Sequence, residues 1–284
     1  MQHRLVKLLG APAPWLMGVV NITPDSFSDG GRHLAPDAAI AHGRRLLAEG
    51  AQILDLGGES TAPGSRPITS EEELLRLEPV VRGLAHGGAV LSIDTYHAAT
   101  AARCIELGAM IVNDVSALRA DPDMAAVVRD LGPVLVMMHA KDGPLPHATD
   151  RPVAYRDVVD DVAAWLKARV EVAVAAGIDP DQIVLDPGWG KFLSLEPEHS
   201  WEMLARFDEL VARLAPLPVS VGISRKGFFR VPMAERDPLS QLTSLVATQK
   251  GAALIRTHDV RMARQFLDAA SRMRLALPAR AVYA

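Results

Sequence analysis

The sequence feature that most constrains the fold is a regular alternation of short apolar runs with longer helix-like segments. Eight runs have the composition and length of buried strands: Trp15–Ile22, Ile53–Gly58, Val90–Thr95, Met110–Val115, Val134–His139, Ile183–Gly188, Val219–Ser224 and Ala253–His258. The amphipathic or alanine-rich segments between them are Pro36–Glu49, Ser70–His86, Ala98–Leu107, Pro122–Leu131, Val153–Ala176, Glu198–Leu214, Leu239–Lys250 and Arg261–Leu275. This alternation predicts a parallel sheet with helices on its outside.

Eight strand–helix units in one chain favour a closed (β/α)8 TIM barrel. The number of strands does not exclude an open doubly wound sheet, which is the alternative. The 284 residues suit a single barrel, and the 49% of hydrophobic residues can supply a large core. Because we find no linker or low-complexity tract, we expect one domain over residues 1–284.

The net charge and the cysteine content bear on which ligands the protein binds and in which compartment it works. The formal net charge of −4 argues against a general nucleic-acid binder, but it leaves room for a local cationic pocket. The single cysteine, Cys104, cannot form an intramolecular disulfide, and the N-terminal apolar run is too short for a secretory signal. We therefore expect a cytoplasmic protein.

Polar residues stand at the carboxyl ends of the predicted strands. The first run ends at Asn21 and continues into a loop dense in turn formers, PDSFSDGG. The other runs end in Glu59, Asp94, Asn113, His139, Asp186, Lys226, Arg256 and His258 or lead directly into them. In a barrel these ends meet at one mouth, where active sites are found. Burying an unpaired charge costs roughly several kcal/mol, so these groups need partners or a ligand. The pattern therefore indicates a binding site.

Two chemical sets occur at this mouth. The first set can hold a flat heterocycle that displays adjacent N–H donors, and it consists of Asp94, Asn113 and Asp186. The second set suits phosphate or carboxylate, and it consists of Arg225, Lys226, Arg256 and His258. Asn21 and the carboxylates could also hold a hard cation such as Mg²⁺. The residues alone thus predict a site for a heterocycle joined to an anionic leaving group.

Seven segments resemble the dihydropteroate synthase family: MGVVNITPDSFSDGG, DLGGESTAPGS, SIDT, GAMIVNDVSA, LDPGWGKFLS, VGISRKGF and IRTHDV. They extend from Leu16 to about Arg261. The resemblance implies a (β/α)8 barrel that joins 6-hydroxymethyl-7,8-dihydropterin diphosphate to p-aminobenzoate with release of pyrophosphate. It also implies Mg²⁺ and a homodimer.

The same resemblance implies residue roles. The pterin would be bound by Asp94, Asn113, Asp186 and Lys226. The diphosphate would be held by Asn21, Arg256 and His258, with Asn21 acting through Mg²⁺. The p-aminobenzoate site would include Thr61 and Ser224. The residues implied to be catalytic are Asp94, Asp186, Lys226 and Arg256.

Two loops depart from the family pattern. The family usually has ESTRPG in the second loop, whereas this chain has Ala62 in place of the arginine that contacts pyrophosphate, and Arg66 could substitute for it. The sixth loop is two residues shorter than the usual form and is similar to that of sulfonamide-insensitive synthases. Either Trp189 or Phe192 would then stand over the p-aminobenzoate ring. Sulfonamide sensitivity itself stays open.

Two other functions are compatible with part of this pattern. A pterin-dependent methyltransferase of the same superfamily is a rival, but the SRK and RTHDV segments suit a diphosphate. A non-condensing pterin-binding paralogue is favoured only by the missing arginine. We expect His139 to have a structural role or to contact the pterin. We expect the run Glu71-Glu72-Glu73 to serve only helix capping and the helix dipole.

Overall fold

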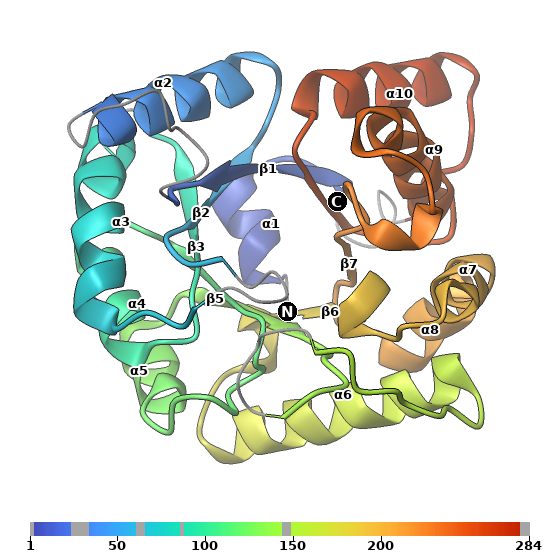
Figure 1. Ribbon diagram of the computed structural model, residues 1–284, viewed down its shortest axis with the longest axis horizontal. Helices are drawn as coiled ribbons and strands as arrows, with labels where there is room; N and C mark the ends of the chain where they lie inside the picture. The colour runs from blue at the N-terminus through green and yellow to red at the C-terminus, as the bar shows by residue number, and fades with distance from the viewer. Residues whose placement is uncertain (1–2, 24–33, 61–65, 86–87, 144–148, 279–284) are drawn as a thin grey trace.

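Eight parallel strands form the centre of the computed structural model, which describes residues 3–23, 34–60, 66–85, 88–143 and 149–278 (Figure 1). The strands are β1 (Trp15–Asn21), β2 (Ile53–Gly57), β3 (Val90–Asp94), β4 (Ile111–Asp114), β5 (Val134–Met138), β6 (Ile183–Asp186), β7 (Ser220–Val221) and β8 (Leu254–Thr257). Hydrogen-bonded neighbours follow the order β6-β5-β4-β3-β2-β1-β8-β7. A parallel bridge between Leu185 and Val219 joins the two ends of this order. The predicted (β/α)8 barrel is therefore confirmed.

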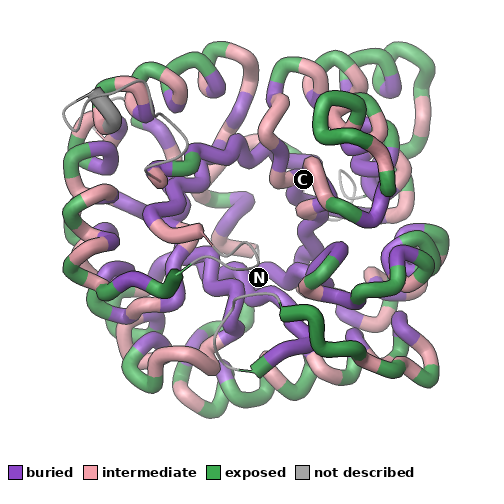
Figure 2. Tube along the Cα trace, in the orientation of Figure 1, coloured by how far each residue is buried: buried purple, intermediate pink, exposed green. Residues whose placement is uncertain are grey.

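Helices surround the strands, as Figure 1 shows. They are α2 (Leu34–Ala48), α3 (Ser70–Ala85), α4 (Ala98–Glu106), α5 (Met124–Leu131), α6 (Val158–Ala175), α7 (Pro197–Ala205), α8 (Phe207–Leu214), α9 (Arg236–Gln249) and α10 (Val260–Arg272). Their outward faces are exposed while the strands are buried (Figure 2). Within the part of the chain described, no helix is both long and apolar enough to cross a membrane.

The alternation of side chains along β2 shows how the barrel separates its apolar layers. Leu54 and Leu56 belong to the large core cluster shared with the surrounding helices. Ile53 belongs instead to a second cluster, with Trp15 and Met17, inside the barrel. Because successive strand residues point to opposite faces, Asp55 lies on the same inward side as Ile53. A strand of otherwise apolar residues thus directs one carboxylate into the barrel.

A short helix, α1 (Arg4–Leu9), contributes to this inner cluster at the N-terminal ends of the strands. Leu5 and Val6 of α1 are buried there. The His3 Nδ1 atom accepts a hydrogen bond from the Leu5 backbone N–H, which caps the helix start. The sequence did not predict α1, since six residues are too few to show a helical period.

The observed helices differ from the predicted ones most clearly at two places. The predicted helix over Glu198–Leu214 is two helices, because Arg206 leaves the helical backbone region at φ −113° and ψ 26°. Its guanidinium is held by Asp157 at 2.8 Å and by Glu202 and Glu209 at 3.0 Å. The Asp157 carboxylate also caps α6, so that this helix begins five residues later than predicted.

We predict that Leu5→Ala lowers the free energy of unfolding by about 2–5 kcal/mol, because it leaves a cavity among side chains that cannot fully collapse. Urea unfolding measures the change. The matched control is Leu75→Ala, whose side chain is 78% exposed and should change stability by less than about 0.5 kcal/mol. Equal stability losses in the two variants would show that α1 does not close the barrel.

Candidate active site

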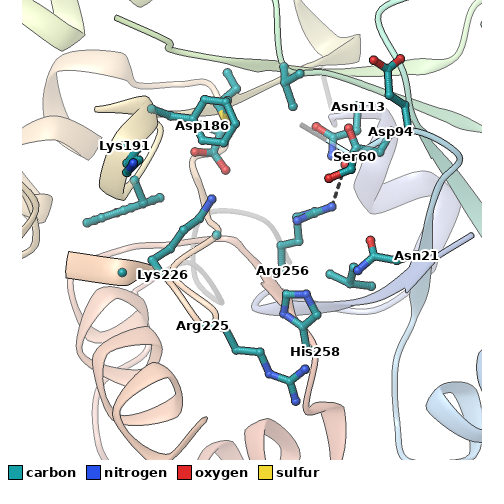
Figure 3. Close-up of a pocket in the computed structure, with 18 of the residues that line it drawn as sticks. Asn21, Ser60, Asp94, Asn113, Asp186, Lys191, Arg225, Lys226, Arg256 and His258 are labelled. Carbon is teal, nitrogen blue, oxygen red and sulfur yellow. Dashed lines mark hydrogen bonds and ion pairs between the residues drawn. The ribbon is translucent and has the colours of Figure 1, made fainter. Parts of the chain in front are cut away.

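The carboxyl ends of the strands enclose a cavity of about 550 Å³, a volume typical of small-molecule sites. Its lining includes seven of the predicted site residues: Asn21, Asp94, Asn113, Asp186, Lys226, Arg256 and His258. Strand register explains the convergence, since Asp94 pairs with Asn113 and Met138 pairs with Asp186 in neighbouring strands. Figure 3 shows these side chains directed toward a common space.

Arg256 connects two carboxylates at the inner end of this cavity. Its Nε lies 2.6 Å from Asp55 Oδ2, and one terminal nitrogen lies 2.7 Å from Asp94 Oδ2. Asp55 Oδ2 also accepts a hydrogen bond from Asn113 Nδ2 at 3.1 Å. Burial alone would lower the pKa of Arg256, but the charges of Asp55 and Asp94 outweigh it and raise this pKa. Arg256 is therefore a permanent cation whose position depends on both carboxylates.

Asp55 is a site residue that the sequence analysis missed. It is completely buried, and it joins Arg256 of β8 to Asn113 of β4. A signal was present in the sequence, because a charged residue interrupts the apolar run of β2. Asp55 lies two residues before the end of β2 on the inward side, and it acts on the cavity by bonding to two residues that line it, Asn113 and Arg256.

Asp186 is held by its own loop and by β7. Its Oδ1 accepts the Gly188 N–H at 2.8 Å, and its Oδ2 accepts the Ser220 hydroxyl at 2.7 Å. Gly188 has a positive φ of 70°, and a Cβ there would lie 2.2 Å from the His139 carbonyl oxygen. Only glycine therefore fits this turn. Burial raises the pKa of Asp186, and these two hydrogen bonds oppose that shift.

The remaining titratable groups of the cavity floor also have shifted pKa values. Burial and the charge of Arg256 lower the pKa of Lys226 to about 8, despite the opposing charges of Asp186 and Asp94. Burial raises the pKa of Asp94 to about 7; the nearby charge of Asp55 adds to this, while Arg256 opposes it. Such shifts occur where ionisable groups share a water-poor pocket.

His258 lies on the other side of the cavity from Asp186 (Figure 3), and it is hydrogen-bonded to Ser224. Ser224 Oγ lies 2.8 Å from His258 Nδ1 and accepts the His258 backbone N–H at 3.2 Å. Burial and the nearby cations Arg256, Arg225 and Lys226 lower the pKa of His258 to about 3, so the imidazole is neutral at physiological pH.

Arg225 does not act as a free cation at the mouth. Its guanidinium makes two 2.8 Å contacts with the Asp237 carboxylate of α9, and Figure 3 shows it turned away from Asp186 and Asn113. Its φ of 59° is one of five positive values found at described residues other than glycine. A bidentate pair of this kind is a strong geometric restraint. The charge of Arg225 is thus largely neutralised within the protein.

The second loop is described only in part. Thr61 and Ala62 lie outside the described residues. Arg66 is exposed and lies 3.3 Å from Glu72 of α3, and it is not among the described residues that line the cavity. Glu59, at the start of this loop, lines the cavity and accepts the Tyr96 hydroxyl at 2.9 Å.

One prediction about α3 was wrong. Glu73 does not serve only the helix dipole, because it is buried and its Oε2 accepts the Thr95 hydroxyl at 2.7 Å. Thr95 directly follows Asp94, so this contact connects α3 to the carboxyl end of β3. Burial raises the pKa of Glu73.

The aromatic residues of the sixth loop have different positions. Trp189 is buried and stacks on Phe207 with ring centroids 6.1 Å apart. Phe192 is partly exposed, and the Lys226 amine lies 4.8 Å from its ring centroid. Both residues contribute to the cavity lining. Phe192 is therefore the more accessible ring for a bound ligand.

His139 has a structural position. Its ring is buried and contacts Trp165 edge-on with centroids 4.9 Å apart, and it is not among the described lining residues. Burial, helped by the charge of Arg119, lowers its pKa to about 3.

Comparisons with known proteins agree with this geometry. A family described as "Pterin binding enzyme" matches residues 17–258. Dihydropteroate synthase of Mycobacterium leprae is 43% identical over 256 residues, covering 87% of this chain and 88% of the relative. Dihydropteroate synthase type-2 of Escherichia coli is 42% identical over 260 residues, covering 89% and 93%. A Xanthomonas albilineans dihydropteroate synthase structure with 4-aminobenzoic acid superposes with a TM-score of 0.84, at 38% identity over 93% of this chain and 94% of that one.

We predict that Asp55→Ala lowers the free energy of unfolding by about 3 kcal/mol, because it removes the fully buried one of the two carboxylates that compensate the half-buried charge of Arg256. Asp150→Ala, which breaks an exposed ion pair with Lys191, is the control and should leave stability unchanged. Chemical denaturation compares the two. An Asp55→Ala variant as stable as the control would remove Asp55 from the centre of the site.

We predict a pH effect from His139. Its pKa is about 3 in the folded state and close to 6.5 when unfolded, so the unfolded chain binds the proton first as the pH falls. Folding stability contributed by the neutral ring is thus lost between about pH 6.5 and 3, at about 2 kcal/mol between pH 7 and 5. His139→Gln should flatten this part of the stability curve measured by urea unfolding, and an unchanged slope would contradict the assignment.

Proposed function

This chain belongs to the dihydropteroate synthase family of pterin-binding enzymes, and we propose that it joins 6-hydroxymethyl-7,8-dihydropterin diphosphate to p-aminobenzoate, releasing pyrophosphate. The observation that carries the proposal is the convergence of four side chains, distant in sequence, on one cavity: Asp94, Asn113, Asp186 and Lys226. A Xanthomonas albilineans relative of 36% identity has been solved with 7,8-dihydropteroate, with a TM-score of 0.81 over 93% of this chain and 94% of that one.

The pterin ring fits the side of the cavity that presents hydrogen-bond acceptors. Asp186 accepts one protein hydrogen bond at each oxygen, and each oxygen keeps a lone pair for adjacent N–H donors of a heterocycle. Asn113 supplies an amide whose NH₂ is held by Asp55, which leaves its carbonyl oxygen as an acceptor. Lys226, whose amine points toward Asp186 in Figure 3, would donate to an acceptor atom of the same ring.

The diphosphate would lie toward Asn21, Arg256 and His258, which line the cavity on the other side from Asp186 (Figure 3). Asn21 ends β1 and presents a single amide oxygen there. One protein oxygen beside a diphosphate fits Mg²⁺, which prefers oxygen ligands and keeps several waters, better than it fits an ion that needs a protein cage. When bound, Mg²⁺ would neutralise charge on the leaving pyrophosphate.

The reaction then follows from charge. The bond between the pterin methylene carbon and the diphosphate oxygen breaks, and its electrons leave with pyrophosphate. The methylene carbon becomes cationic, and the carboxylates Asp94 and Asp186 stabilise this charge electrostatically. The aniline nitrogen of p-aminobenzoate then forms the new C–N bond and loses a proton. Phe192, the partly exposed ring of the cavity lining, would contact the incoming p-aminobenzoate. The family resemblance implies Thr61 and Ser224 as further contacts of this substrate.

Oligomeric state and location complete the proposal. The family resemblance supports a homodimer, which light scattering of the purified protein would measure. The lone cysteine, whose burial raises its pKa to about 12, is compatible with a reducing cytoplasm.

We predict that Asp186→Ala and Lys226→Ala each lower the condensation rate by at least a factor of about 10²–10³, because each removes a preorganised group that contacts the pterin. The measurement is pyrophosphate release in the presence of both substrates. The matched controls are Asp208→Ala and Lys250→Ala, which break an ion pair between α8 and the C-cap of α9, and neither residue lines the cavity. Turnover near that of the controls would refute the assigned roles.

The same assay without p-aminobenzoate separates the alternatives. A condensing enzyme forms dihydropteroate together with pyrophosphate. Pyrophosphate release with no dihydropteroate would indicate a defective acceptor site. No release under either condition would favour a pterin-binding protein that does not condense its ligand.

A further inference from the structure

The hydroxyl of Ser224 is bonded to His258 in a way that bears on the anion site. Ser224 lies three residues after the end of β7 and is buried. The ring of His258 lines the cavity next to Arg256 and Asn21 (Figure 3). The His258 backbone N–H can only donate, so at 3.2 Å it occupies one lone pair of Ser224 Oγ. The 2.8 Å contact between Oγ and His258 Nδ1 is the second bond of this hydroxyl.

The proton count decides the direction of that second bond. A neutral imidazole carries one N–H, on either Nδ1 or Nε2. If Nδ1 carried it, the hydroxyl proton of Ser224 would have no acceptor within bonding distance among the described residues. If Nδ1 is the acceptor, the Ser224 hydroxyl donates its proton to Nδ1. The hydroxyl, Nδ1 and the His258 backbone N–H then all have a hydrogen-bond partner. Leaving a buried hydroxyl proton unpaired costs about 1–3 kcal/mol, which favours the second arrangement.

We propose that Ser224 is a positioning residue that holds His258 in its Nε2–H tautomer, so that a neutral histidine donates a hydrogen bond to the diphosphate. This role differs from the contact with p-aminobenzoate that the family resemblance implies for Ser224. The inference rests on the proposed function for its ligand, but the tautomer itself is a property of the unliganded protein.

Two features of the site give this arrangement a purpose. Arg225 is engaged by Asp237, and Arg256 is engaged by Asp55 and Asp94, so much of the cationic charge on this side is already compensated. An N–H donor that needs no proton from solvent adds to the anion site without adding a further charge. In the other tautomer, with the proton on Nδ1, Nε2 would present a lone pair to the phosphate oxygens and repel them. The hydrogen bond from the Ser224 hydroxyl to Nδ1 disfavours that tautomer.

The first test reads the tautomer directly. Long-range ¹H–¹⁵N correlation spectra of ¹⁵N-histidine-labelled, unliganded protein, with His258 assigned by comparison with His258→Gln, should show a protonated Nε2 and an unprotonated Nδ1. Ser224→Ala should shift the population toward the other tautomer. A protonated Nδ1 in the wild type would overturn the inference, whatever the enzymatic activity.

The second test measures function through a double-mutant cycle. Inorganic pyrophosphate with Mg²⁺ is the probe, and calorimetry should show about tenfold weaker binding to Ser224→Ala than to the wild type, as expected for one lost hydrogen bond to a charged acceptor. In the His258→Gln background, Ser224→Ala should have no further effect, because Ser224 acts through His258. Ser224→Thr, which keeps the hydroxyl, should restore binding.

Controls distinguish this role from the others. Ser194 and His199 form a similar pair, with 2.8 Å between Ser194 Oγ and His199 Nδ1, among residues that do not line the cavity. Ser194→Ala should therefore leave pyrophosphate binding unchanged. Additive effects of Ser224→Ala and His258→Gln, or a loss in Ser224→Ala confined to the KM for p-aminobenzoate, would overturn the positioning role. A wild-type enzyme that binds both substrates but does not condense them would refute the proposed function and leave the tautomer result standing.

Discussion

The ion pairs of Arg256 with Asp55 and Asp94 are the interaction on which the active site depends. They connect β8, β2 and β3 across the interior of the barrel, and Asp55 extends the connection to Asn113 of β4. Without these carboxylates, the half-buried guanidinium of Arg256 would destabilise the fold. The same bonds hold Asp94 and Asn113 in place before any ligand arrives, so the site is preorganised by the groups that it uses.

The barrel provides two separate environments along its axis. At the N-terminal ends of the strands, α1 and an apolar cluster fill the interior. At the carboxyl ends, charged and amide side chains line a cavity instead, and the pKa values of Asp94 and Lys226 both move toward neutrality there. The apolar half supplies stability, while the polar half carries groups that would be costly without partners. This division follows from the position of polar residues late in each strand.

Much of this could be predicted from the sequence. The eight strands, their order of βα units and the convergence of Asp94, Asn113, Asp186 and Lys226 follow from hydrophobic patterning and from where polar residues end each run. Asp55 and Glu73 were missed because their roles depend on which partner faces them across the barrel, and sequence distance does not show this. The pairing of Arg225 with Asp237 likewise depends on where the first turn of α9 lies relative to the segment that follows β7. Local pattern predicts elements, whereas ion-pair partners are set by the closed fold.

The most direct test of the account is the binding of its two ligand halves to separate parts of the cavity. Calorimetry with 6-hydroxymethylpterin, and separately with Mg²⁺ and pyrophosphate, would compare the wild type with Asp186→Ala. The account predicts that Asp186→Ala loses pterin binding and keeps pyrophosphate binding, because Asp186 lies on the heterocycle side of the cavity. Unchanged pterin affinity in this variant would contradict it.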